Sequence, residues 1–319
     1  VPRGVRMTGR PRSAAVRLLR NRVFLALCLA CTSLAVLALA ILLVSVLVQG
    51  VPGLRWNFLS EYASRKPERA GILAPLVGSV WVCVTCMLLS LPVGVATAVY
   101  LEEFARRTRL NRFIELNVRN LAGVPSIVYG IIGLTAFSRM FGLVGSADGT
   151  PVVLGDPDGF LHIELPFGQS VLAGGLTLML VILPIVIIAS QEALRAVPRG
   201  MRQASEALGA TRWQTTWKVT LPAAAPTILT GAILAMSRAI GEAAPLLVLG
   251  IPLFIASTPE SLMDQFTVLP FQIYSWASRP QSAFHDLAAS GIIVLLAVLL
   301  SFNALAISLR LRLQRSTAS

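Results

Sequence analysis

Long apolar runs separated by short polar segments dominate the pattern of side chains along this chain. Six such runs can be recognised, at 24–49, 73–101, 119–138, 170–190, 226–250 and 288–309. An α-helix of about 20 apolar residues crosses a hydrocarbon core roughly 30 Å thick. A helix in lipid satisfies its own backbone hydrogen bonds, so these runs predict an all-α bundle. The pattern therefore predicts an all-α membrane protein with six transmembrane helices.

The third run is the least hydrophobic of the six, because Gly123, Pro125, Gly130 and Gly133 interrupt it. Glycine and proline are nevertheless common in membrane helices, where small residues let neighbouring helices pack closely. We therefore predict a third span at 119–138.

The composition agrees with a membrane protein rather than a soluble one. Hydrophobic residues make up 55% of the 319 residues and charged residues only 13%. The first apolar run is about 25 residues long, whereas the core of a secretory signal has roughly 7–15. We therefore expect the first span to be an uncleaved signal-anchor.

The net charge of +12 is distributed unevenly between alternate loops, which argues against nucleic-acid binding. The N-terminal tail (residues 1–23) has seven arginines and no acid. Together with the segments 102–119 and 191–225 and the C-terminal end, which would lie on the same side of the membrane, it carries twenty basic residues. The loops at 50–72, 139–169 and 251–287 carry six basic and nine acidic residues. Cytoplasmic loops are enriched in Lys and Arg. We therefore expect tails 1–23 and 311–319 and loop 191–225 in the cytoplasm, flanking a transmembrane domain at 24–310.

The loop at 191–225 has helical character without membrane character. A short helix is expected over residues 200–209, and Gly209 suits its end because glycine tolerates the left-handed conformation that terminates helices. Trp213 and Trp217 are four residues apart and are expected to share a helix edge. Such an element suits docking into a groove on another protein. The alternative is an amphipathic segment that lies on the lipid surface.

Arg238 and Glu242 are the only charged residues of the fifth predicted span. Arg238 is twelve residues beyond Pro226, or roughly 18 Å along a helix, which places it near the bilayer centre. The spacing i, i+4 puts both side chains on one helix face. A mid-membrane arginine costs about 2.5–3.5 kcal/mol on insertion scales, so such residues usually line a polar pathway. A structural ion pair between helices is the alternative.

Gly241 and Pro245 lie beside this pair. Proline cannot donate a hydrogen bond to the carbonyl of residue 241, so we expect the helix to kink or loosen there. The break could serve a cavity or packing alone.

The chain offers little for bond-breaking chemistry, metal binding or cofactor binding. Two C-x-x-C pairs, Cys28/Cys31 and Cys83/Cys86, fall at different depths of two spans and are expected to pack as small hydrophobes. The histidines, His162 and His285, are expected in external loops. No lysine follows a G-x-x-x-x-G run, so the chain has no P-loop. We expect no metal, no cofactor and no catalytic residue.

Residues 203–222 (QASEALGATRWQTTWKVTLP) resemble the motif by which permease subunits of bacterial ABC importers dock onto their ATPase. In that pattern E-A-A and three residues precede a glycine, and nine residues separate the glycine from I-x-L-P. Here Gly209 is followed by nine residues and then by VTLP. The resemblance assigns the coupling role to a set of residues: Gln203, Ala204, Ser205, Glu206, Gly209, Leu221 and Pro222. Gln203 stands where the motif usually has a glutamate, and Glu206 could take the role of that glutamate.

Three further segments are similar to phosphate-specific (Pst) permeases, in particular to the A-type (PstA) subunit: LAGVPSIVYG at 121–130, RAIGEAAP at 238–245 and IYSWASRP at 273–280. The resemblance covers about residues 70–310 and implies a type I ABC importer permease (MetI-like) fold. It also implies phosphate passage near Arg238 and Glu242. The implied setting is the bacterial inner membrane.

The partners implied by the resemblance are a second, C-type permease in a heterodimer, two copies of a cytoplasmic ATPase and an external phosphate-binding protein. ATP-driven closure of the ATPases would then open the pathway outward by alternating access. Two alternatives stay open: an importer of another oxyanion such as sulphate or molybdate, and a membrane enzyme or ATP-independent transporter.

Overall fold

The computed structural model describes residues 14–106, 108–142, 152–154 and 163–318. Its α-helices are α1 (Ala14–Gly50), α2 (Trp56–Ser60), α3 (Leu73–Val99), α4 (Arg109–Leu121), α5 (Ser126–Ile132), α6 (Val171–Ala196), α7 (Arg199–Ala207), α8 (Arg212–Thr215), α9 (Leu221–Gly241), α10 (Ala244–Leu249), α11 (Leu269–Ala277) and α12 (Ser282–Ala318). π-Helical turns at Tyr100–Phe104, Gly133–Ser138 and Thr216–Thr220 extend α3, extend α5 and precede α9. Short 3-10 turns occur at Val51–Gly53, Pro67–Arg69 and Met140–Gly142, and β1 (Val152–Leu154) pairs antiparallel with β2 (Ile163–Leu165).

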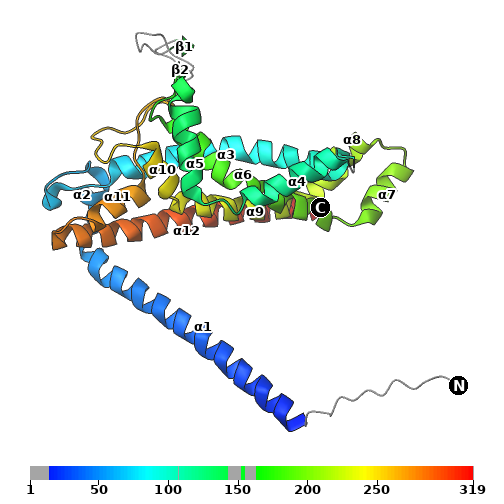
Figure 1. Ribbon diagram of the computed structural model, residues 1–319, viewed down its shortest axis with the longest axis horizontal. Helices are drawn as coiled ribbons and strands as arrows, with labels where there is room; N and C mark the ends of the chain where they lie inside the picture. The colour runs from blue at the N-terminus through cyan, green and yellow to red at the C-terminus, as the bar shows by residue number, and fades with distance from the viewer. Residues whose placement is uncertain (1–13, 107, 143–151, 155–162, 319) are drawn as a thin grey trace.

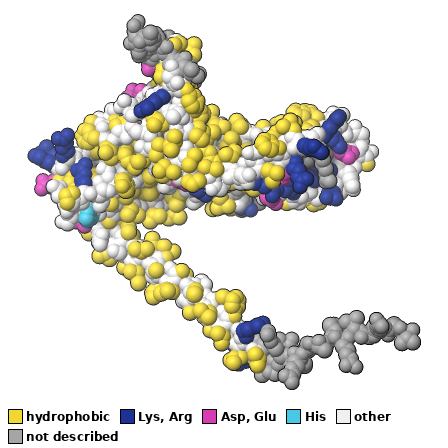
Figure 2. Space-filling model, viewed as in Figure 1, with side chains coloured by type: hydrophobic (Ala, Val, Ile, Leu, Met, Phe, Trp, Pro, Cys, Tyr) yellow, Lys and Arg dark blue, Asp and Glu magenta, His cyan; other side chains and the backbone are white. Residues whose placement is uncertain are grey.

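The long helices α3, α6, α9 and α12 lie side by side and form the bundle (Figure 1). Helix α6 is the most enclosed, and Leu178 and Ile182 on it are almost fully buried among side chains of α3 and α9. α7 and α8 lie at one end of the bundle, which we call the loop end, and α2 and α11 lie at the opposite end. Hydrophobic side chains cover most of the surface between these two ends (Figure 2). Lys and Arg side chains gather at the ends themselves.

Helix α1 diverges from the bundle (Figure 1), and none of its apolar window is buried. It meets α12 only near its C-terminal end, where a Cβ on Gly50 would lie 2.7 Å from the backbone of Ala289. Ser290 donates a hydrogen bond to the carbonyl of Gly50 at 2.8 Å. A glycine at this position therefore allows the close approach that anchors α1.

The third predicted span requires a correction, because residues 119–138 are not one straight helix. α4 ends at Leu121, α5 begins at Ser126, and the chain bends by 109° between them. Pro125 disfavours helical continuation from the residue before it, and the Tyr129 hydroxyl donates to the Leu121 carbonyl across the bend at 2.7 Å. The bend is thus fixed by a local break and by a buried tyrosine.

Two glycines of the α5 segment permit tight helix packing. A Cβ on Gly130 would lie 2.7 Å from the carbonyl oxygen of Pro245 in α10, and one on Gly133 would overlap Thr177 of α6. Small residues allow such close approach between membrane helices. The segments 121–130 and 238–245, distant in sequence, therefore meet in the structure.

The fifth predicted span, 226–250, also requires a correction at its start. A single helical run extends from Arg212 to Gly241, so the helix begins within the predicted loop at 191–225 and passes through Pro222 and Pro226. Pro222 has no N–H to donate, and the helix passes it by a π-turn at Thr216–Thr220. The predicted break beside Pro245 is confirmed: α9 ends at Gly241 and α10 begins at Ala244.

Five helices of the described residues are long and apolar enough to span a membrane, and the bent α4–α5 pair brings the number to six. The cysteines lie in α1 and α3, with Cys83 and Cys86 buried and Cys28 and Cys31 exposed. His162 lies outside the described residues, and His285 is exposed at the start of α12.

Candidate docking surface and substrate pathway

Helix α7 ends in a Schellman motif at Gly209. The Ala210 N–H donates to the Ser205 carbonyl at 3.2 Å, and the Gly209 N–H donates to the Glu206 carbonyl at 3.0 Å. Gly209 has φ +86°, in the left-handed region, and no atom lies within 4 Å of the position its Cβ would take. The predicted stop at Gly209 is confirmed, and the residue is needed for its backbone conformation rather than for space.

The first residues of the predicted coupling motif lie on α7. Gln203, Ala204 and Glu206 are exposed, whereas Ser205 is half-buried and shares a 2.9 Å hydrogen bond with Thr215 of α8. Thr211 and Gln214 form a capping box that starts α8. The loop is therefore a preformed pair of short helices with its motif residues turned outward.

Exposed aromatic and aliphatic side chains lie beside this helix pair. The Trp213 and Trp217 rings meet edge-on at 5.4 Å, which confirms the predicted aromatic edge, and Trp213 also meets Phe104 at 5.8 Å. Leu208 at the tip of the loop is 90% exposed. An exposed apolar group rimmed by polar residues is typical of an interaction site.

Leu221 and Pro222 connect the loop to the bundle. Leu221 packs against a buried cluster made of residues from α3, α6 and α9, namely Ala98, Val99, Ala193, Leu194, Val197, Ala224 and Ile228. The run from Arg212 into α9 is helical throughout. A displacement of α8 would therefore be passed directly to α9.

Ion pairs that the sequence did not reveal fasten the loop end. Arg202 of α7 donates to Glu103 at 2.9 Å and to the Leu194 carbonyl at 2.7 Å. Arg195 at the end of α6 forms two hydrogen bonds with Glu102 and one with Glu115 of α4 at 3.2 Å. The Arg202 and Glu103 positions are 99 residues apart, so no spacing rule could pair them.

Arg238 and Glu242 form the predicted ion pair, with Nε and Oε1 3.2 Å apart. The Arg238 side chain is 54% exposed and that of Glu242 is 17% exposed. Gly231 of α9 lies against Ala189 of α6, because a Cβ on Gly231 would be 2.4 Å from the Cβ of Ala189. The two helices run in opposite directions, so Arg238, seven residues after Gly231, lies at about the level of Ile182, seven residues before Ala189. That level is near the middle of α6, which agrees with the predicted mid-membrane position.

The chain leaves most of the Arg238 guanidinium free for another partner. Within the described residues Arg238 donates only to Glu242, through one of its five N–H groups. Glu242 lies in the break, with extended backbone (φ −82°, ψ 111°). The neighbouring Ser237 donates to Asn303 of α12 at 2.6 Å, a polar contact that sequence reasoning missed. The arrangement can hold an oxyanion through a planar fork of donors.

Comparison with protein families gives one match. The model for "Binding-protein-dependent transport system inner membrane component" matches residues 90–318, which include α4–α12 and all the motif residues above.

Curated relatives agree with that match. The chain is 32% identical over 202 residues to the probable ABC transporter permease protein YqgI and 35% identical over 223 residues to YqgH, both of Bacillus subtilis. These alignments cover 63% and 68% of this chain but only 60% and 62% of the two relatives. The phosphate transport system permease protein PstA of Haemophilus influenzae is 28% identical, with 89% of this chain and 91% of the relative covered.

Solved structures show the same fold. A chain of a bacterial alginate ABC transporter, solved with a periplasmic protein bound to an alginate pentasaccharide, superposes with a TM-score of 0.62 at 14% identity and covers 92% of this chain and 95% of its own. A chain of the inward-facing MetNI methionine ABC transporter superposes with a TM-score of 0.50 at 16% identity, covering 76% of this chain and 94% of its own.

Proposed function

The chain belongs to the family of binding-protein-dependent transport system inner membrane components, and from this premise we propose that it is a permease subunit of an ATP-driven phosphate importer. The observation that carries passage of an anion is Arg238, a half-exposed guanidinium at mid-depth beside a broken helix. The names of relatives such as the PstA protein of Haemophilus influenzae supply phosphate as the cargo.

An oxyanion at this depth would be stabilised mainly by Arg238, because the membrane interior offers few other hydrogen-bond donors. Guanidinium N–H groups match phosphate oxygens in pairs, and such charge-assisted bonds are stronger than neutral ones. Glu242 holds the arginine at one edge and leaves the other donors free. The break at Gly241–Ala243 lets the pair sit on irregular backbone, as membrane proteins tolerate where a cavity is lined.

The proposed partners follow from what the chain leaves uncovered. The outward-facing α7–α8 pair, with Leu208, Trp213 and Trp217 exposed, suits a groove on an ATPase. Because Arg238 is open on one side, a second, C-type permease is proposed to complete the pathway, and an external phosphate-binding protein to load it. Two ATPase copies would serve the two permeases. The excess of basic residues at the tails and at 191–225 supports a cytoplasmic location for both termini.

Alternating access follows from the same connections. Closure of the ATPases would displace α7 and α8, and the continuous run from Arg212 would carry that motion into α9. The ion pairs of Arg195 and Arg202 would carry it into α3 and α6. In this cycle no covalent bond of the phosphate is made or broken by the chain, which therefore acts as a transport subunit.

Competition between anions tests the cargo. ATP-dependent uptake of labelled phosphate is measured in vesicles that contain the chain with its partner permease, ATPase and binding protein. An excess of unlabelled phosphate should abolish the signal, whereas an excess of sulphate or molybdate should leave it unchanged. Equal competition by sulphate or molybdate would assign the chain to another oxyanion, and uptake without any ATPase would refute the ATP-driven mechanism.

A further inference from the structure

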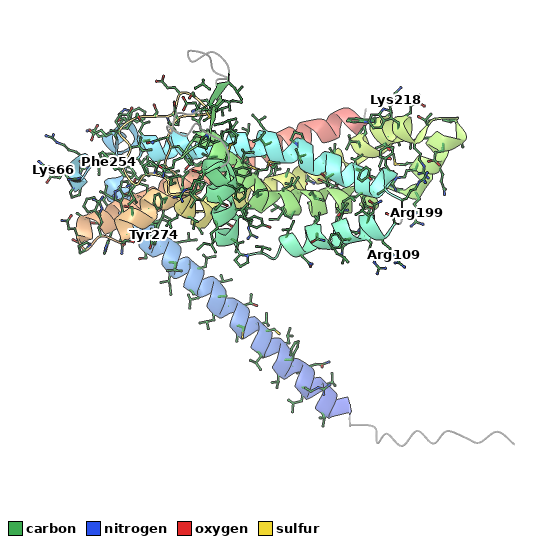
Figure 3. All side chains as sticks on the ribbon, turned by 45° about the horizontal axis from the view of Figure 1, so that its top comes forward. Lys66, Arg109, Arg199, Lys218, Phe254 and Tyr274 are labelled. Carbon is green, nitrogen blue, oxygen red and sulfur yellow. The ribbon has the colours of Figure 1, made fainter. Side chains whose placement is uncertain are left out.

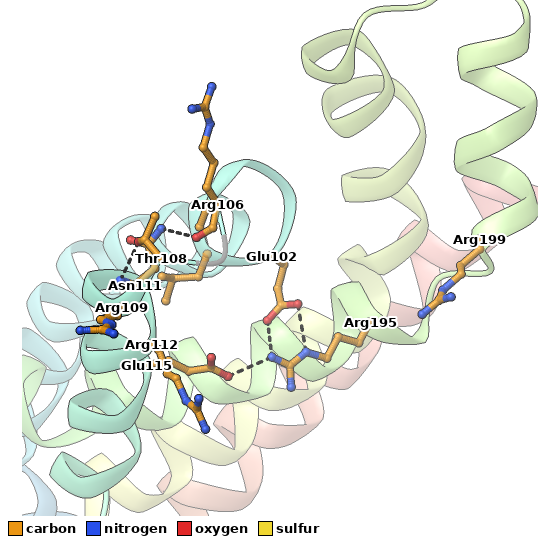
Figure 4. A pocket seen from close by; sticks show the side chains of 11 residues that line it. Glu102, Arg106, Thr108, Arg109, Asn111, Arg112, Glu115, Arg195 and Arg199 are labelled. Atoms are coloured by element: carbon orange, nitrogen blue, oxygen red, sulfur yellow. Dashed lines mark hydrogen bonds and ion pairs between the residues drawn. The ribbon is translucent and has the colours of Figure 1, made fainter.

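A basic cavity at the loop end contains arginines that the proposed transport step does not use. It has a volume of about 730 Å³ and lies between α4, the end of α3 and the junction of α6 with α7 (Figure 4). Its lining includes charged residues of both signs: Arg106, Arg109, Arg112, Arg195, Arg199, Glu102 and Glu115. Five arginines against two glutamates leave a formal charge of +3.

The two acids of this cavity already have arginine partners, and Glu115 is shared between Arg195 and Arg119. Arg195 binds Glu102 through two hydrogen bonds and Glu115 through a third, as the dashed lines in Figure 4 show. Arg106, Arg109, Arg112 and Arg199 make no side-chain ion pair with any described residue. Four positive groups in one space thus have no ion-pair partner among the described residues, which favours an anionic ligand.

The rim of the cavity is held in place by local bonds. The Thr108 hydroxyl accepts a hydrogen bond from the Asn111 N–H at 3.3 Å and caps α4, and the Asn111 side chain donates to the Arg106 carbonyl at 2.8 Å. Arg109 and Arg112 follow on the first turn of α4. The arginines on α4 therefore project from an ordered helix start rather than from a loose loop.

The apolar side of α4 identifies the kind of anion. Leu110 is 67% exposed and Phe113 is 64% exposed, and they alternate with Arg109 and Arg112 on the same two turns. An amphipathic helix that presents arginines next to large exposed apolar residues suits the boundary between headgroups and acyl chains. The apolar runs of α3 and α6 also end at this level, at Phe104 and Ala196.

We propose that this cavity binds the phosphodiester headgroup of an anionic phospholipid of the inner leaflet. The site uses the orientation given under the proposed function, with the loop end in the cytoplasm. Basic pockets between membrane helices on that side are suited to anionic headgroups. Arg199 opens α7 while Arg109 and Arg112 belong to α4, and Figure 3 shows Arg109 and Arg199 at the same end of the bundle. A bound headgroup would therefore bridge the coupling helix and the third span.

Lipid binding by the full chain tests the site without transport. The chain in neutral detergent is titrated with phosphatidylglycerol or with phosphatidylcholine of the same acyl chains, and bound lipid is counted by native mass spectrometry. Each arginine near the surface contributes about fivefold in affinity for an anionic lipid, so Arg109→Gln with Arg112→Gln should weaken phosphatidylglycerol binding about 25-fold. Arg20→Gln with Arg22→Gln in α1 removes the same charge outside the cavity and should change the affinity by less than about twofold.

The remaining arms separate the sources of the phosphate group and report on folding. An unchanged Tm and unchanged phosphatidylcholine binding in the double variant show that the chain is folded. Equal losses in the two double variants would refute a specific site. Displacement of the lipid by millimolar inorganic phosphate would assign the cavity to the free anion instead. Loss of ATPase co-purification with phosphatidylglycerol binding retained would assign the arginines to the partner protein.

Discussion

The two charged regions along α9 and its flanking loop differ in how the chain completes them. At the loop end Arg195 and Arg202 each bind more than one acceptor, from α3, α4 and the end of α6. At mid-depth Arg238 has Glu242 as its one partner among the residues that the structure describes, and 54% of its side chain is exposed. Charges that the chain satisfies itself serve its structure, whereas an expensive charge left open indicates a partner or a substrate.

The cost of each charge supports this distinction. An arginine at the bilayer centre costs about 2.5–3.5 kcal/mol on insertion scales, while exposed ion pairs near water change stability by about 0–1 kcal/mol. Packing alone offers no reason to keep Arg238 in its position. The loop-end pairs require no such explanation, because each is supported by neighbouring hydrogen bonds.

The largest effect is expected where the mid-depth break is packed. In Gly130→Val a side chain would overlap the backbone of Pro245, so we expect the free energy of unfolding to fall by about 3 kcal/mol or more. Gly241→Ala is the matched control, because no atom lies within 4 Å of its Cβ position. Denaturation in detergent measures both, and equal stabilities would show that the α5–α10 contact does not hold the break.

A smaller loss is expected at the loop end. Arg202→Met removes the donor to Glu103 and to the Leu194 carbonyl, which leaves a half-buried carboxylate unpaired and should cost about 2 kcal/mol. The same denaturation measures it. Stability unchanged within about 0.5 kcal/mol would mean that this end is not fastened by its ion pairs.

The conformation of Gly209 gives a third test, specific to docking. Gly209→Val forces a β-branched residue into the left-handed region at a cost of about 1–2 kcal/mol, whereas Gly209→Asn tolerates that region. Neither side chain meets a neighbour at Cβ, so only the backbone preference differs. We expect Val to reduce co-purification of the ATPase and Asn to preserve it. Equal recovery with both variants would contradict a docking role for the α7 terminus.

The smallest effect is expected for the exposed pair of Arg119 and Glu115. Their side chains are 52% and 35% exposed, and Arg119→Gln should cost about 0.3–0.5 kcal/mol. Because Glu115 keeps Arg195 as a partner, its charge is not left alone. A loss of unfolding free energy as large as that of Arg202→Met would contradict the distinction between exposed ion pairs and ion pairs supported by further hydrogen bonds.

Elements set by local patterns could be predicted from the sequence. Apolar runs gave the spans, Gly209 gave the end of α7, and Pro245 gave the break after α9. The docking and pathway roles of these residues remain predictions.

Features that depend on contacts between distant residues could not be predicted. The 109° bend depends on the hydrogen bond from Tyr129 to the Leu121 carbonyl. The attachment of α7 depends on the ion pair between Arg202 and Glu103, which are 99 residues apart in the sequence. The helix through Pro222 was missed because a π-turn compensates for the lost donor, an adjustment that has no sequence signal.

The most direct test of the account is phosphate uptake by reconstituted complexes that carry Arg238→Gln. Loss of a charge-assisted contact should lower ATP-dependent uptake at least about tenfold, with ATPase co-purification unchanged. Arg55→Gln, an exposed arginine at the opposite end, is the control and should transport normally. Undiminished uptake by Arg238→Gln would show that the open mid-membrane arginine does not serve the anion.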